Sequence, residues 1–315
     1  MNNKKVAVCS RSFSRNKVLR EKLSERYPLS TFNDEGVKLQ GDSLVAFLKG
    51  HEKAIIALEN IDETILKQLP ELEVISKYGV GLDMIDMSAM HSHYKLLGWS
   101  GGVNRRSVSE LVISFAIALL RHVPSSYREV LSGTWRQHVG SYLSGKTVGI
   151  IGCGAIGQDL SVLLKAFDCQ IIVNDIQDYS EFYELNHIKP VGLDQLLKSA
   201  DIVTLHTPLD DSTRNILNRQ KLELMKPSAI LINAARGGLV DEVALRNMLQ
   251  DNRIAAAAFD VFAVEPPEDK ELLELPNFLV TPHIGGSAEE AILAMGMAAI
   301  EGLDNAKDPL IFARN

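Results

Sequence analysis

Residues 147–157 read Thr147-Val-Gly-Ile-Ile-Gly-Cys-Gly-Ala-Ile-Gly157, and this stretch decides the fold. Its apolar start predicts a short buried strand, and its Gly-x-Gly-x-x-Gly end predicts a tight turn into a helix. Each glycine has a separate physical role, since Gly152 allows the turn, Gly154 lets a pyrophosphate approach the backbone, and Gly157 lets the helix pack on the strand. The unpaired N–H groups at the start of the helix favour phosphate there.

The residues after this turn complete a dinucleotide-binding pattern. Apolar residues recur at helical spacing from Leu160 to Phe167, so one helix face can lie on a sheet. A second strand, 171–174, ends at Asp175, whose carboxylate can accept hydrogen bonds from the adenosine ribose. Residues 176–178 hold no Arg or Lys for a 2′-phosphate, which favours NAD over NADP. A glycine-rich turn alone is a weak signal, but the whole pattern favours a cofactor over a purely structural turn.

Length and composition bound the class of protein. A chain of 315 residues predicts two domains, and its net charge of -7 argues against nucleic acid or a membrane surface as the main partner. The longest apolar runs hold ten residues, half of what a membrane span needs, so we expect buried helices. Three cysteines without Cys-x-x-Cys spacing indicate neither a disulfide framework nor a metal site. With no signal-peptide pattern at the N-terminus, we expect a cytoplasmic protein.

The first 104 residues predict an α/β segment of their own. Buried strands are expected at 6–9, 54–58 and 74–78, with an amphipathic helix at 16–27. Gly79-Val80-Gly81 follows the third strand, where free backbone N–H groups can bind an anion, although a tight strand-to-helix connection explains these glycines equally well. The passage from Gly101 to Asn104 suits a hinge before a long helix that begins near Ser107.

Strands and helices keep alternating beyond Asp175. Near-continuous apolar runs predict parallel strands, covered on both faces, at 200–205, 229–233, 254–259 and 278–280. The final helix, 288–303, is apolar nearly all round, so we expect it to be buried against the first domain or another subunit. The fold class is therefore α/β, with two doubly wound parallel-sheet domains.

Polar or ionisable residues follow the carboxyl ends of these later strands. They are Thr207, Arg236, Asp260, Glu265 and His283. Each has an ordinary structural explanation alone, such as a surface histidine or a solvated loop carboxylate. The carboxyl ends of parallel strands share one edge of a sheet, however, so the five would meet beside the bound dinucleotide. Their joint placement favours an active site.

Three segments resemble the signature stretches of the D-isomer-specific 2-hydroxyacid dehydrogenases. They are Asn233-Ala-Ala-Arg-Gly-Gly-Leu-Val-Asp-Glu242, Phe259-Asp-Val-Phe-Ala-Val-Glu-Pro-Pro267 and Thr281-Pro-His-Ile-Gly-Gly286, and the similarity reaches upstream to Gly79-Val-Gly-Leu-Asp83. The chain ends soon after the helix that follows His283, so it most resembles the short D-3-phosphoglycerate dehydrogenases. The resemblance implies a homodimer, and a Rossmann NAD domain, 105–283, inserted in a flavodoxin-like substrate domain, 1–104 plus 284–315.

The resemblance also implies roles for individual residues. His283 is the acid/base, Glu265 its partner, and Arg236 the cation that holds the substrate carboxylate and polarises the reacting oxygen. An imidazole suits proton transfer near neutral pH, and a guanidinium fork matches a carboxylate in a way that Lys cannot. Backbone N–H groups around Val80 and Gly81 would grip the same carboxylate. The implied cofactor contacts are Gly152, Gly154, Ala155, Ile156, Gly157, Asp175, Thr207, Ala234, Arg236, Asp260, His283, Gly285 and Gly286, with Asp260 orienting the nicotinamide carboxamide.

The departures from the family pattern lie on the substrate side. Phosphoglycerate enzymes of the family usually carry Arg at the position of Lys77 and another Arg where this chain has Leu58-Glu59-Asn60. Lys77 keeps one positive charge for substrate binding, as a point charge rather than a fork. The first substrate pair to expect is still 3-phosphoglycerate and 3-phosphohydroxypyruvate, and a 2-oxo acid of the hydroxypyruvate or glyoxylate type is the alternative within the class. An NAD-sensing binding protein, similar to the co-repressors of this fold, is the alternative of another class. The presence of Arg236, Glu265 and His283 together favours an enzyme.

Overall fold

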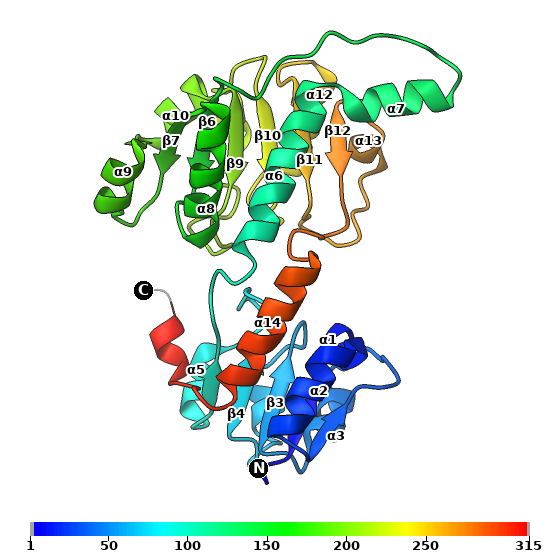
Figure 1. Cartoon of the computed structure of the whole chain (residues 1–315), viewed down its shortest axis with the longest axis vertical. Coiled ribbons are helices and arrows are strands. Elements are labelled where there is room, and N and C mark those ends of the chain that lie inside the picture. The colour runs from blue at the N-terminus through cyan, green and yellow to red at the C-terminus, as the bar shows by residue number, and fades with distance from the viewer. Residues whose placement is uncertain (1–2, 314–315) are drawn as a thin grey trace. The chain divides into compact units, whose positions relative to one another are not determined.

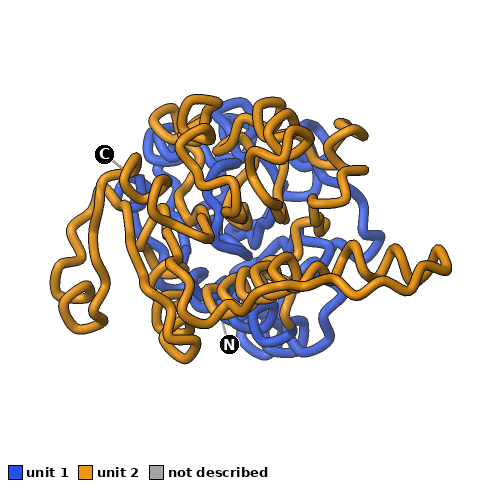
Figure 2. Tube along the Cα trace, turned by 90° about the horizontal axis from the view of Figure 1, so that it is seen from above, with its two compact units in different colours: residues 1–104, 289–315 blue, residues 105–288 orange. Residues whose placement is uncertain are grey.

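The computed structural model describes residues 3–313 and divides them into two compact units (Figure 2). Unit 1 comprises Met1–Asn104 and Glu289–Asn315, and unit 2 comprises Arg105–Ala288. Residues 284–288 therefore stay with unit 2, whereas the sequence pattern assigned them to the first domain. The reason is local, because the Gly285 N–H donates to Asp260 and the Ser107 hydroxyl donates to the Gly285 carbonyl.

Unit 1 is built on a five-stranded parallel sheet with the order β2-β1-β3-β4-β5. The strands are β1 (Val6–Val8), β2 (Ser30–Phe32), β3 (Lys53–Ile56), β4 (Val74–Lys77) and β5 (Leu96–Gly98). This order is that of flavodoxin-like doubly wound folds. β1, β3 and β4 are buried throughout, and apolar residues make up all of β1 and most of β3, whereas β4 ends in the buried polar residues Ser76 and Lys77.

Helices cover both faces of this sheet (Figure 1). They are α1 (Arg11–Arg15), α2 (Lys17–Arg26), α3 (Asp42–Leu48), α4 (Glu63–Leu66), α5 (Met87–Ser92), α14 (Glu289–Gly302) and the short η2 (Pro309–Phe312). The last long helix, α14, packs against α2 at Gly296, where an added Cβ would lie 2.3 Å from Leu19. The C-terminal segment therefore completes the core of unit 1.

Unit 2 is built on a seven-stranded parallel sheet with the order β12-β11-β10-β9-β6-β7-β8. Its strands are β6 (Thr147–Ile151), β7 (Gln170–Asn174), β8 (Lys189–Pro190), β9 (Ile202–Leu205), β10 (Ile230–Asn233), β11 (Ala256–Phe259) and β12 (Phe278–Val280). Counted from β6, this is the Rossmann order 3-2-1-4-5-6 with one more strand beyond the sixth. The order reverses beside β6, directly before the glycine motif.

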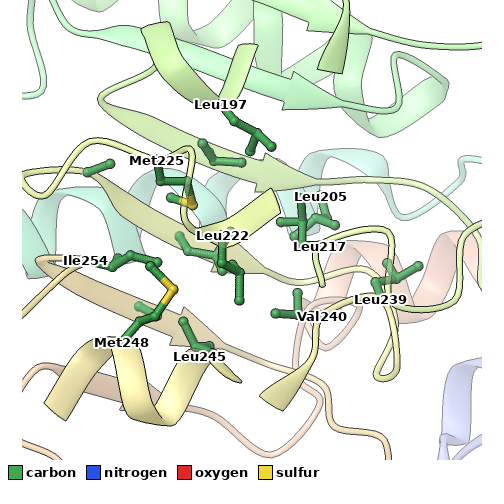
Figure 3. Packing of buried hydrophobic residues seen from close by; sticks show 14 of the residues in the cluster. Leu197, Leu205, Leu217, Leu222, Met225, Leu239, Val240, Leu245, Met248 and Ile254 are labelled. Carbon is green, nitrogen blue, oxygen red and sulfur yellow. The ribbon is translucent and has the colours of Figure 1, made fainter. Parts of the chain in front are cut away.

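Two hydrophobic cores lie on the two faces of this second sheet. The helices are α6 (Arg105–Leu120), α7 (Val123–Leu131), α8 (Ala155–Leu164), η1 (Lys165–Phe167), α9 (Ser180–Asn186), α10 (Leu193–Ser199), α11 (Arg219–Leu222), α12 (Glu242–Gln250) and α13 (Lys270–Leu273). Figure 3 shows part of one core, in which buried side chains such as Leu197, Leu222 and Met248 gather between helices and strands. Both faces are covered, and the predicted fold class is confirmed.

Element boundaries differ from the sequence pattern at a few places. The predicted strand 54–58 ends at Ile56, because the Glu59 carboxylate accepts the Ala57 N–H and turns the chain, leaving Leu58 77% exposed. The pattern also missed the short edge strands β2, β5 and β8, which contain little continuous apolar sequence. α7 buries none of its residues on unit 2.

Within the described residues, no single helix is long and apolar enough to cross a membrane. Taken together, α6 and α7 meet the length and composition requirements of a membrane span, but the two helices are bent by 61° relative to each other.

Candidate active site

The glycine motif closes one end of the site in unit 2. Gly152 has a φ of 94°, and a Cβ there would lie 2.7 Å from the backbone of His206. At Gly157, an added Cβ would lie 2.3 Å from the Gly152 carbonyl oxygen, so only glycine lets α8 approach the turn this closely. Gly154 precedes α8, and a Cβ there would meet no atom within 4 Å. The motif therefore has two glycines required by packing and one that faces open space.

Asp175 lies beside this turn, at the end of β7. Its Oδ2 accepts the Cys153 N–H at 2.5 Å, and its Oδ1 accepts the Gln177 N–H at 2.8 Å. The carboxylate is half-buried and fixed by the backbone of the glycine turn itself. Burial, and then the charge of Asp175, raise the pKa of the Cys153 thiol to about 12, so this thiol stays protonated.

His206 and Thr207 follow β9 and face the same turn. Burial lowers the pKa of His206 to about 3, so its ring is neutral, and its Nε2 lies 2.9 Å from the Thr204 hydroxyl. The Nδ1 of His206 and the hydroxyl of Thr207 are buried without a hydrogen-bond partner in the described chain. Buried polar atoms normally have partners, so these two mark a place suited to a polar ligand.

The loop after β10 carries Arg236. Asn233 shapes it, because its side chain donates to the Arg236 carbonyl at 2.9 Å and accepts the Ala235 N–H at 3.2 Å. The Arg236 guanidinium is partly exposed, and its Nη1 donates to the Ala235 carbonyl at 2.7 Å. Ala234, an expected cofactor contact, is buried at the start of the loop.

Asp260, after β11, ties the loop after β12 in place. It is 1% exposed, and its carboxylate accepts the Thr281 hydroxyl at 2.5 Å, the Ile284 N–H at 2.8 Å and the Gly285 N–H at 2.7 Å. Its backbone carbonyl accepts the His283 N–H at 2.9 Å. Asp260 therefore fixes the backbone around His283, and its expected contact with the nicotinamide carboxamide stays a prediction.

Glu265 and His283 form a hydrogen-bonded pair at this edge of the sheet. The Glu265 Oε2 lies 2.9 Å from the His283 Nδ1, and the Glu265 Oε1 accepts the Phe262 N–H at 3.1 Å. The side chains are 40% and 50% exposed, so the pair borders open space. His283 has a φ of 55°, an uncommon backbone conformation that the bonds to Asp260 hold. Because Nδ1 faces Glu265, the tautomer is fixed and Nε2 is left for a ligand.

The loops after β10 and β11 are locked together. A Cβ on Gly237 would lie 1.9 Å from the Phe262 carbonyl, so the backbone that follows Arg236 rests directly on the backbone that binds Glu265. A guanidinium, a carboxylate and an imidazole thus come from three adjacent strand ends.

The three residues expected to bind substrate lie in unit 1. The Lys77 side chain is 4% exposed, and its ammonium donates to the Ala57 carbonyl and, at 3.5 Å, to the Tyr78 carbonyl. The Val80 carbonyl accepts the Trp99 Nε1–H at 3.1 Å. Gly79 has a φ of 117°, a backbone conformation that favours glycine, so a glycine begins this turn. Val80 and Gly81 are partly exposed at the carboxyl end of β4.

Sequence reasoning quoted Thr281 and Glu242 within signature stretches and Ser107 as a helix start, but it gave none of the three a role in the site. Thr281 follows a predicted strand directly, which could have drawn attention to it. Glu242 starts α12 after the capping residue Asp241, and its contact with the Ala263 N–H at 2.8 Å has no sequence signal. Within residues 3–313, no group of three or more His, Cys, Asp or Glu side chains could hold a metal ion.

The residues around the glycine motif fit NAD. Gly154 offers an unobstructed backbone, Asp175 a fixed carboxylate, and Thr207 a buried hydroxyl without a partner. The open backbone suits a pyrophosphate, the carboxylate suits a ribose diol, and the hydroxyl suits a further polar group of the cofactor. Ala155 and Ile156 begin α8, and Gly285 and Gly286 follow His283.

Comparison with known proteins agrees with this geometry. Residues 113–285 match the family described as D-isomer specific 2-hydroxyacid dehydrogenase, NAD binding domain. The chain is 39% identical over 244 residues to D-3-phosphoglycerate dehydrogenase from Methanocaldococcus jannaschii, covering 76% of this chain and 47% of that protein. It is 35% identical over 270 residues to hydroxypyruvate reductase from Thermotoga maritima, covering 84% and 87%. The chain spans about half the length of the D-3-phosphoglycerate dehydrogenases that it matches.

A solved structure gives the same result. A protein from Polaromonas sp. JS6 66, described as a D-isomer specific 2-hydroxyacid dehydrogenase, superposes with a TM-score of 0.87 at 27% identity and covers 96% of both chains. The resemblance drawn from three sequence motifs is confirmed. With its family NAD-binding domain in residues 113–285, this chain belongs to the D-isomer-specific 2-hydroxyacid dehydrogenases.

Proposed function

We propose that the protein is an NAD-dependent oxidoreductase that transfers a hydride between NAD(H) and a D-2-hydroxy acid/2-oxo acid pair. The observation that carries this proposal is the 2.9 Å contact of His283 with Glu265, next to the Arg236 loop on a sheet that matches the family's NAD-binding domain. NAD, when bound, accepts or donates the hydride at its nicotinamide ring.

In the proposed reaction the chain supplies a proton and a cation. Reduction of a 2-oxo acid adds a proton to the C2 oxygen, and His283 would deliver it from Nε2. Glu265 holds Nδ1, orients the ring and stabilises its protonated form. The Arg236 fork would bind the carboxylate and stabilise the developing charge on the C2 oxygen. In the oxidative direction, His283 would take the proton back.

We assign the cofactor to unit 2 and the remaining substrate contacts to unit 1. The glycine motif, Asp175 and Thr207 support the first assignment. For the second, backbone N–H groups around Val80 and Gly81 follow a buried strand at the carboxyl edge of unit 1's sheet, where such folds bind ligands. The Lys77 ammonium beside them would add a positive charge to that edge.

For the substrate, we propose a 2-oxo acid without a phosphate group, of the hydroxypyruvate or glyoxylate type, ahead of 3-phosphohydroxypyruvate. The Lys77 ammonium is buried and bonded to backbone carbonyls, and Glu59 brings a carboxylate to the adjacent loop. A dianionic phosphate would lose its hydration there without an Arg fork to replace it. The Thermotoga maritima hydroxypyruvate reductase also matches over most of its length.

The test is consumption of NADH with a panel of 2-oxo acids, with and without a C3 phosphate. The wild type should turn over at least one acid, and His283→Ala should lower kcat/KM by about 10²-fold or more. NADH binding, followed by fluorescence, should survive this substitution. Tight NADH binding without turnover of any acid would contradict the proposal and favour an NAD-sensing protein.

We also propose that the protein is a cytoplasmic homodimer. Its three cysteines are free, as is usual in a reducing compartment. The arm, residues 121–142, exposes large apolar side chains: Val123, Tyr127, Val130, Leu131, Trp135, Val139 and Tyr142. At its base lies a cavity of about 300 Å³ lined partly by Leu120, Ile230 and Ala256. Apolar patches of this kind usually mark an interface, and a two-fold axis would pair each arm with the other copy's cavity.

A further inference from the structure

Residues 263–266, which present Glu265, receive little support from side-chain packing. These residues are all exposed, and Val264 is 59% exposed. Behind them lies a hollow of about 150 Å³, lined in part by Glu242, Phe262, Ala263 and Pro267. The ring of Phe262, the residue before this segment, packs in the core against Phe259 and Phe278. Other contacts must therefore hold the segment that carries the carboxylate.

Two contacts do so from outside the segment. The Glu242 Oε1, at the first residue of α12, accepts the Ala263 N–H at 2.8 Å. Gly237 lies against the Phe262 carbonyl, where a Cβ would be 1.9 Å away. The backbone of Phe262 and Ala263 is thus held between the α12 N-terminus and the loop after Arg236.

The held backbone is the one that orients the proposed catalytic pair. The Phe262 N–H donates to the Glu265 Oε1 at 3.1 Å, and the Glu265 Oε2 binds the His283 Nδ1 at 2.9 Å. A displacement of the Ala263 backbone would also displace Phe262, and therefore Glu265 and the imidazole of His283. Small misplacements of a proton-transfer group lower rates strongly.

We infer that Glu242 is a positioning residue for the reaction, and that its bond to the Ala263 N–H sets the geometry of the Glu265–His283 pair. This inference rests on the proposed function. Burial, and then the charges of Asp269 and Asp241, raise the pKa of the Glu242 carboxyl, so the protein holds a carboxylate here against an electrostatic penalty. The bond to Ala263 offsets part of that penalty.

The test compares Glu242→Ala with Glu242→Gln, which keeps an oxygen that can accept the Ala263 N–H. Glu242→Ala should lower kcat by about 10-fold or more, leave the NADH dissociation constant unchanged, and move the pH profile of kcat in the same direction as Glu265→Gln. Glu242→Gln should restore most of kcat. Glu268→Ala removes another carboxylate from the rim of the same hollow and should behave like the wild type.

A double-mutant cycle separates positioning from general loss of structure. If Glu242 acts through Glu265, then Glu242→Ala should cost much less in a Glu265→Gln background than in the wild type. Fully additive losses, or a wild-type kcat for Glu242→Ala, would overturn the inference while leaving the proposed function intact.

Hydrogen exchange gives a readout that does not depend on turnover. The peptide 261–267 should exchange faster in Glu242→Ala than in the wild type, Glu242→Gln or Glu268→Ala. If the wild type reduces no acid yet this pattern appears, the proposed function fails, but the stabilising role of the Glu242–Ala263 hydrogen bond is supported. If exchange is equal in all four proteins, that role is itself refuted.

Discussion

Two histidines in unit 2, each within three residues of a strand end, lie in different surroundings. His206 is kept neutral by burial next to the glycine turn, while His283 stands half-exposed with a carboxylate on Nδ1. A histidine is thus a neutral, buried side chain at position 206 and a candidate proton donor and acceptor at position 283. The difference comes from burial and from the partner, and not from residue type.

His206 should make the stability of unit 2 depend on pH. Its folded pKa of about 3 lies below the unfolded value of about 6.5, so between these values only the unfolded chain binds the proton. Its contribution is complete above about pH 6.5 and is lost as the pH falls, by about 1.4 kcal/mol per unit. The free energy of unfolding in urea at pH 6.5 and 5.0 should therefore fall more for the wild type than for His206→Gln.

Equal losses in the two proteins would contradict this prediction. The other titrating groups are common to both, so they cancel in the comparison. Thr204→Val is a useful companion, because it removes the hydroxyl at 2.9 Å from Nε2 without adding a titrating group.

At the scale of elements, close backbone contacts decide which strands and helices pair. In unit 1, Gly98 at the end of β5 and Gly302 at the end of α14 touch directly, and an added Cβ on Gly98 would lie 2.2 Å from the Gly302 carbonyl oxygen. The Ser76 hydroxyl, on β4, donates to the Ala299 carbonyl at 2.6 Å. These contacts fix α14 on the sheet although some 190 residues separate β5 from it in the chain.

Gly302→Ala should therefore destabilise unit 1. The new Cβ would lie 2.4 Å from the Ser76 hydroxyl oxygen, and such overpacking costs about 1–3 kcal/mol. Urea unfolding followed by fluorescence of Trp99, which lies in unit 1 against Phe312, measures this loss. Gly192→Ala, where a Cβ meets nothing within 4 Å, is the matched control. A Gly302→Ala midpoint equal to that of the control would show that the contact relaxes freely.

At the scale of the whole molecule, the chain passes between its two units after Asn104 and again after Ala288. Each unit has its own parallel sheet and its own pair of cores. The expected cofactor residues and the proposed acid/base pair belong to one unit, and the proposed carboxylate-binding turn belongs to the other. If these proposals hold, turnover should require both units, whereas NADH binding should require only unit 2.

The arm of residues 121–142 makes a prediction about assembly. The wild type should have about twice the 34.7 kDa mass of one chain in light scattering, and Tyr127→Glu with Leu131→Glu should halve that mass. Both side chains lie on one side of α7, are 65% and 70% exposed, and would place charges in an apolar interface. Leu185→Glu, on α9, is the control. A monomeric wild type, or a dimer that survives both charges, would refute the proposed interface.

The sequence by itself determined the architecture and the family, and it predicted the candidate site residues. Most buried parallel strands have near-continuous apolar sequences, and the glycine motif identifies its turn. Arg236, Glu265 and His283 follow predicted strands. These features can be recognised because each depends on residues near each other in the chain. The sequence did not show edge strands such as β2, which bury too little to leave a pattern.

Only the tertiary structure decided which groups hold the site together. The Asp260 carboxylate that fixes the His283 loop, the Gly237 backbone pressed on Phe262, and the Glu242 tether to Ala263 join segments of different strands and helices. A side chain's own neighbourhood in sequence says nothing about such a partner, since the contact exists only after the sheet has brought two strand ends to one edge. The physical reason is that hydrogen-bond partners are chosen by distance in space, and distance in space is fixed by the packing of the whole unit.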